Sequence, residues 1–146
     1  METYIEKIPE WLTAVSSFGL FCVAWYQIRK LIRSNTIQLV LNLESELNSR
    51  KVRIDDVSSS LRHASNEGNM TKLEIIEDDL EAAIDGYLNV LDRLCFCILK
   101  DYMKDRDWQS EYRELLQDTI RNNEDKFGTG TYYKNIKTLY ENWSKS

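Results

Sequence analysis

The chain has 146 residues, which allows one ordinary domain or a small domain with an appendage. Charged residues make up 29% and hydrophobic residues 42%, which excludes a disordered tail and a multi-span membrane protein. Five glycines and one proline are too few for a collagen-like or turn-rich all-β protein. The net charge of −5 argues against a protein that binds duplex nucleic acid.

The first predicted element is an uncharged stretch of 18 residues from Trp11 to Ile28. As a helix it would be about 27 Å long, close to the hydrocarbon core of a bilayer, which is about 30 Å thick. Aromatic residues stand at both ends, where an aromatic belt would lie. The stretch therefore predicts a transmembrane helix. The alternative is a buried core helix, because Thr13, Ser16 and Gln27 dilute the hydrophobicity.

Basic residues set the predicted orientation of this helix. Arg29, Lys30 and Arg33 follow the stretch directly, and only Lys7 precedes it. The positive-inside rule places the chain after such a cluster in the cytoplasm. We therefore expect a single-pass protein of the cell inner membrane, in contact with lipid, with residues 1–33 as an N-terminal transmembrane segment and residues 34–146 as a cytoplasmic ligand-binding domain.

The cytoplasmic part is expected to contain about four helices, so that the predicted fold class is all-α. The first begins near Thr36 and ends at a polar loop, residues 64–69. The second begins with a capping box at Thr71 and runs to near Met103; its first half is acidic, which suits a helix N-terminus. The third covers residues 107–122, and the last begins at Thr131 after a loop at residues 124–130. The apolar positions of the first helix have helical spacing: Val40, Leu43, Leu47, Ile54, Val57 and Leu61.

Residues for catalysis or metal binding are scarce. Cys22, Cys95 and Cys97 contain no CxxC pair, and the chain has a single histidine, His63. This set predicts neither a disulfide framework nor a zinc site. No GxSxG, HExxH or Walker motif occurs. We therefore expect a protein that is not an enzyme and has no catalytic residues, metal or cofactor.

A glycine-spaced loop, residues 127–131 (FGTGT), is the first candidate binding site. It precedes a predicted helix, whose N-terminus offers free backbone N–H groups and a positive dipole end to an anion. Tyr132 could stack on a base, and Lys134 could bind a phosphate. The alternative is a plain loop in which Thr131 is the helix N-cap.

A basic cluster is the second candidate. It comprises Arg50, Lys51 and Arg53, with Arg62 and His63 further along the chain. A solvated helix face or contact with anionic lipid are the alternatives. Along a straight helix, Arg50 would lie about 30 Å from Arg29, too far for headgroup contact. The cluster therefore favours another anionic partner.

Three segments carry a resemblance to a known group of proteins: IQLVLNLESELNSRK, YLNVLDRLCFCI and YYKNIKTLYENW. With the predicted membrane helix, they resemble small bacterial membrane-anchored helical proteins, and more specifically the membrane effectors that accompany type III CRISPR systems. That resemblance implies an antiviral defence protein whose cytoplasmic domain binds a cyclic oligoadenylate, cyclic tetra-adenylate, and which perturbs the membrane.

A four-fold symmetric ligand is most simply held by four copies of one subunit, so the resemblance implies a homotetramer. Binding would shift a bistable tetramer, and the continuous helix would pass the change to the membrane spans. The expected ligand-binding residues are Arg50, Lys51, Arg53, Thr129, Thr131, Tyr132 and Lys134. The competing hypothesis is a single-pass membrane-anchored adaptor whose helical domain binds another protein and no small ligand.

Overall fold

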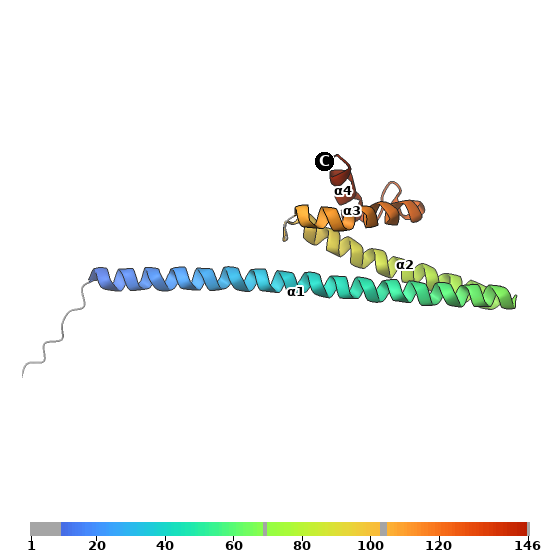
Figure 1. The fold of residues 1–146 in the computed structure, drawn as a ribbon, viewed down its shortest axis with the longest axis horizontal. Coiled ribbons are helices and arrows are strands. Elements are labelled where there is room, and N and C mark those ends of the chain that lie inside the picture. The colour runs from blue at the N-terminus through green and yellow to red at the C-terminus, as the bar shows by residue number, and fades with distance from the viewer. Residues whose placement is uncertain (1–9, 69, 103–104, 146) are drawn as a thin grey trace, which may run out of the picture. The chain divides into compact units, whose positions relative to one another are not determined.

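The computed structural model describes the backbone of residues 10–68, 70–102 and 105–145, and the side chains of these residues from 18 onward except 105–107. Its elements are α1 (Glu10–Glu67), α2 (Met70–Leu99), α3 (Asp105–Asn122), the 3-10 helix η1 (Glu124–Phe127) and α4 (Lys134–Ser144) (Figure 1). The part of the chain so described contains no strand. The prediction of an all-α fold is confirmed. The chain divides into two compact units, Met1–Ile37 and Gln38–Ser146.

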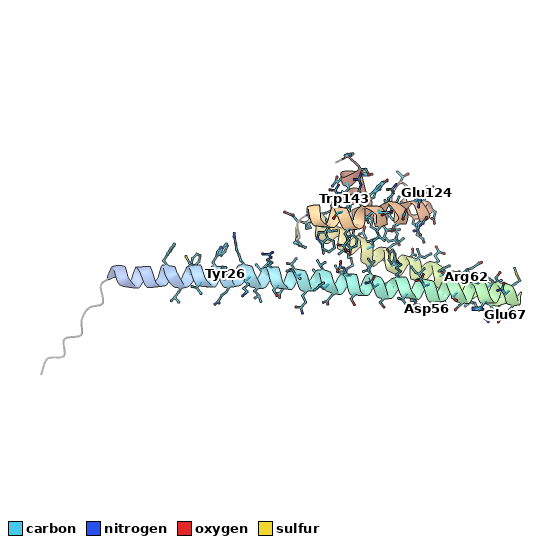
Figure 2. The ribbon with its side chains drawn as sticks, in the orientation of Figure 1. Tyr26, Asp56, Arg62, Glu67, Glu124 and Trp143 are labelled. Atoms are coloured by element: carbon cyan, nitrogen blue, oxygen red, sulfur yellow. The ribbon has the colours of Figure 1, made fainter. Side chains whose placement is uncertain are left out.

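The second unit has one hydrophobic core. Three α2 leucines at helical spacing, Leu88, Leu91 and Leu94, are almost fully buried, as the apolar period of this segment predicts. They belong to one cluster with residues from α1, α3 and α4, of which Figure 2 labels Trp143 of α4. The buried residues that the other helices contribute are Val40, Leu43, Leu47, Trp108, Tyr112, Leu116, Ile136, Leu139 and Trp143.

Helix α1 extends further than the sequence predicts. The expected loop at residues 64–69 is wrong at its start, because α1 continues to Glu67 and Ala64 is fully buried. Serine and asparagine weaken a helix without breaking it. The first true stop is Gly68, which adopts a left-handed φ of +69°, a conformation that glycine takes without strain.

Helix α2 ends at Leu99, four residues before the predicted Met103. Tyr102 donates its N–H to the Cys97 carbonyl at 3.2 Å, and Asp101 donates to the Ile98 carbonyl at 2.9 Å. These two bonds form a Schellman motif, which needs a left-handed residue after the helix. Asp101 fills that position with φ +55°.

The predicted transmembrane helix and inner-membrane location are wrong. Among the residues that the structure describes, no helix is long and apolar enough to cross a bilayer. In the sequence, polar residues interrupt the uncharged stretch from Trp11 to Ile28, among them Thr13, Ser16 and Gln27. Residues 1–9, which belong to the predicted N-terminal segment of residues 1–33, lie outside the described residues.

Candidate functional site

A hollow of about 380 Å³ lies at the loop that the sequence singles out. It is lined by Asp85 of α2, by Asp125 and Lys126 of η1, and by residues 128–133. The lining includes three of the predicted ligand-binding residues, Thr129, Thr131 and Tyr132. The side chain of Tyr132 is 93% exposed. The structure therefore brings the loop residues together at a concave surface.

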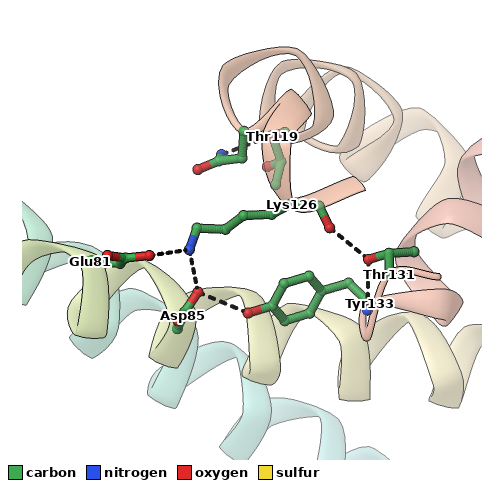
Figure 3. Close-up of polar contacts among 7 residues, drawn as sticks. Glu81, Asp85, Thr119, Lys126, Thr131 and Tyr133 are labelled. Carbon is green, nitrogen blue, oxygen red and sulfur yellow. Dashed lines mark hydrogen bonds and ion pairs between the residues drawn. The ribbon is translucent and has the colours of Figure 1, made fainter. Parts of the chain in front are cut away.

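The Lys126 ammonium is the cation of this hollow, and two carboxylates already hold it. Its Nζ lies 2.8 Å from Asp85 Oδ1 and 3.2 Å from Glu81 Oε1, both on α2 (Figure 3). The side chain of Lys126 is only 17% exposed. The hydrogen bond with Asp85 is the largest cause that raises the pKa of Lys126. Lys126 remains protonated, but the two carboxylates balance its positive charge, so it attracts a phosphate only weakly.

Tyr133 completes this network from the loop side. Its hydroxyl donates to Asp85 Oδ1 at 3.0 Å, and its ring packs against Phe127 with centroids 5.8 Å apart. Burial, followed by the hydrogen bond to Asp85, raises the pKa of Tyr133 to about 12. The hydrogen bond from Lys126 is the largest cause of the lowered pKa of Asp85. The Asp85 carboxylate thus joins α2 to both η1 and the start of α4.

The hydroxyl of Thr131 is used within the loop. It donates to the Lys126 carbonyl at 2.7 Å and accepts from the Tyr133 N–H at 3.1 Å (Figure 3). The interpretation of Thr131 as the helix N-cap is wrong, because α4 begins at Lys134 and its N-cap residue is Tyr133. Gly130 has φ +94°, which makes the turn that folds this hydroxyl back on the loop.

The N-terminus of α4 is occupied by Asp92, a carboxylate of the chain itself. Asp92 Oδ1 accepts from the N–H groups of Asn135 at 2.9 Å and Ile136 at 3.1 Å. Asp92 Oδ2 accepts from the Asn135 side-chain amide at 2.6 Å. These are donors that the predicted anion would need, so the arrangement disfavours a second anion at this helix end. Lys134, the first residue of α4, is exposed.

The basic cluster of α1 lies elsewhere. Arg50 pairs with Glu46 at 3.2 Å and rests against Gly86 of α2, where an added Cβ would stand 3.1 Å from its Nη1 atom. Lys51 and Arg53 are exposed on α1. None of the three basic residues is among the described residues that line the hollow. The structure therefore does not gather the predicted site residues into one site.

The sequence analysis explains the acids of α2 by the helix N-terminus, so it does not indicate that Asp85 and Asp92 contact later segments of the chain. The two lie seven residues apart and are half-buried, so they share one side of α2. The spacing of Asp85 and Asp92 can be read from the sequence. The contact of Asp92 with Asn135 of α4 cannot, because Asn135 lies 43 residues further along the chain.

No protein-family model matches the chain, and comparisons with curated proteins and with solved structures likewise found no match. The resemblance to type III CRISPR membrane effectors stays a prediction. What the protein does must be inferred from its own surfaces.

Proposed function

We propose that this protein is a helical interaction module that associates with a second copy of itself through the N-terminal part of α1. One observation supports the proposal: nine large apolar side chains between Phe18 and Ile32 are each more than half exposed, at 51–72%. Figure 2 shows side chains along this segment, with Tyr26 labelled. Monomeric soluble proteins rarely expose contiguous apolar patches larger than a few hundred Å².

The segment has the spacing of a coiled-coil seam. Five of the exposed residues follow each other at alternating intervals of three and four: Phe18, Phe21, Trp25, Ile28 and Ile32. In the sequence, Trp11 and Ala14 continue this spacing toward the N-terminus. Apolar residues with this repeat over about three heptads are typical of helices that pair along one face. We name the five described residues the α1 seam.

The flanking positions favour a second copy over a foreign partner. Charged residues that flank a coiled-coil seam select the partner helix. Among the described residues that flank the α1 residues at this spacing, one is charged, Arg29. The Arg29 guanidinium lies over the chain's own Trp25 ring, 5.4 Å from its centroid. Asn35 occupies the next seam position, so that two identical parallel helices in register would place their two asparagines together. The seam thus carries no feature that selects a different sequence.

The area is sufficient for a specific contact. If each side chain of the α1 seam buries about 100 Å², two copies bury about 1,000 Å² together, near the lower limit for a specific interface. Removal of that surface from water, at about 25 cal/mol per Å², is the driving force.

The experiment measures the mass of the full chain by light scattering over a range of concentrations. We expect a mass that is a multiple of 17.3 kDa for the wild type and 17.3 kDa for Phe21→Glu. Val23→Glu is the matched control, because Val23 is also apolar and more than half exposed but stands off the seam. It should remain associated. A monomeric wild type, or equal behaviour of both variants, would contradict the proposal.

Nucleotide binding is the second candidate, and the exposed Tyr132 beside a hollow of about 380 Å³ favours it. Every base can stack on such a ring. Cyclic tetra-adenylate should then raise the melting temperature of the wild type and of Tyr26→Ala, a control at another exposed tyrosine, but not of Tyr132→Ala. Absence of any shift in the wild type would exclude this candidate.

A further inference from the structure

A second hollow, of about 370 Å³, lies in the unit formed by residues 38–146. Its walls are mainly apolar, from Leu39 and Leu43 of α1, Phe96 and Cys97 of α2, and Tyr102. The Schellman motif that ends α2 fixes one wall, because it ties the Tyr102 N–H to the Cys97 carbonyl. We name this hollow the Arg93 pocket, after the cation that lines it.

The polar residues of the Arg93 pocket are Arg93 and Asn135. Among the described residues that line it, none is acidic, and Arg93 makes no ion pair with any residue that the structure describes. The Asn135 side-chain amide is committed to Asp92. Lys100 lies beside the pocket wall, with its Nζ 5.6 Å from the centroid of the Phe96 ring.

Arg93 is exposed, and its charge acts on the Cys97 thiol that lines the pocket. Burial raises the pKa of the Cys97 thiol, and the neighbouring Arg93 charge opposes that rise. The hollow at residues 128–133 differs from the Arg93 pocket in the charged groups that line it. That hollow is lined by two carboxylates and by a lysine held in ion pairs, whereas the Arg93 pocket offers an exposed cation, without an ion pair to any described residue, beside an apolar surface.

We propose that the Arg93 pocket binds an alkyl carboxylate, such as a medium-chain fatty acid, with the chain on the apolar wall and the carboxylate on Arg93. A guanidinium binds a carboxylate through two parallel hydrogen bonds, and the apolar wall removes the alkyl chain from water. The volume suits a small molecule, since such pockets span about 300–1,000 Å³.

The test is calorimetric titration of the full chain with decanoate below its micelle concentration. Decanoate should bind the wild type, and the affinity should fall by about tenfold or more in Arg93→Gln because the charged hydrogen bonds are lost. Arg62→Gln is the matched control, since it removes the same charge at an exposed site of α1. Decanol, which lacks the carboxylate, should bind the wild type as weakly as decanoate binds Arg93→Gln.

Two further variants locate the binding. Leu39→Trp fills the pocket from a partly exposed position and should abolish binding. Phe21→Glu, in the α1 seam, should leave binding unchanged, which separates this proposal from self-association. No binding of decanoate to the wild type, equal affinity in Arg93→Gln, or equal affinity for decanol would overturn the proposal.

Discussion

At the scale of single residues, Asp92 and Asp85 connect α2 to the segments that follow it. Asp92 accepts two backbone N–H groups and one side-chain amide from the start of α4. A carboxylate in this position satisfies donors that α4 cannot satisfy itself, and its charge opposes the positive end of the helix dipole. The residue N-terminal to α4, Tyr133, provides no side-chain cap. Asp92, a residue of α2, therefore accepts the N–H groups of α4 that a local N-cap side chain usually accepts.

We expect Asp92→Ala to lower the free energy of unfolding by about 2 kcal/mol, because it removes a charged cap and leaves partly buried donors without a partner. Asp79→Ala is the control, at an exposed position of the same helix, and should change the value by less than about 0.5 kcal/mol. Urea denaturation of the full chain measures both. Equal effects of the two substitutions would show that Asp92 has no capping role.

The Asp85 carboxylate should make stability depend on pH in the acid range. Its pKa in the folded chain lies below the ordinary 3.8, chiefly because Lys126 hydrogen-bonds to it. A lowered folded pKa means that the unfolded chain binds the proton more readily. The stabilisation is therefore complete above about pH 4 and is lost as the pH falls through the lower folded value.

The measurement compares urea midpoints at pH 6 and pH 3. The midpoint should fall less in Asp85→Asn than in the wild type, because the variant has no carboxylate to protonate. The midpoint of Asp78→Asn, a substitution at an exposed position of α2, should fall as much as the midpoint of the wild type. If Asp85→Asn and the wild type lose the same stability, the Asp85–Lys126 pair does not contribute.

At the scale of elements, the positions of the helices agree with the sequence prediction, but several helix ends do not. The apolar period located α2 and α4, because the buried faces must recur every three or four residues. The ends depend on a few local or distant contacts. Gly68 stops α1 after residues that the sequence assigned to a loop. The start of α4 moved from Thr131 to Lys134, because Thr131 bonds within its loop.

The end of α2 offers a test at this scale. Asp101 adopts a left-handed φ of +55°, which costs a residue with a side chain more than it costs glycine. We expect Asp101→Gly to raise the free energy of unfolding by about 0.5–1 kcal/mol. Asp55→Gly, the same substitution on the exposed face of α1, should lower it. A loss of stability in Asp101→Gly would contradict the Schellman assignment.

The candidate site shows where sequence reasoning stops. The glycines of residues 127–131 predict a loop before a helix, because glycine is a local signal, and Gly128 and Gly130 do lie between η1 and α4. The ion pair of Lys126 with Glu81 cannot be predicted in this way, because the two residues lie 45 positions apart in the sequence. The Arg93 pocket was missed for the same reason. Its lining comes from α1, α2 and α4, and no spacing within one helix indicates that these residues meet.

At the scale of the whole molecule, the two units differ in surface chemistry. Between residues 11 and 37 the chain carries three bases, Arg29, Lys30 and Arg33, and no acid. The net charge of −5 therefore arises elsewhere, mainly in the helical bundle. The exposed apolar surface follows the same division, with its longest run in the first unit. Under the two proposals, association belongs to the first unit and ligand binding to the second, with one Arg93 pocket in each associated copy.

Thiol labelling along α1 tests the α1 seam most directly. In a Cys22→Ser background, the thiol introduced by Ile28→Cys lies on the seam, and that introduced by Gln27→Cys lies off it. Burial raises the pKa of Cys95 and of Cys97, so these native thiols react slowly in both proteins. We predict that the seam thiol is labelled about tenfold more slowly than its neighbour, and that Phe21→Glu removes the difference. If the thiols at positions 28 and 27 are labelled at equal rates in proteins that keep Phe21, self-association through α1 is contradicted.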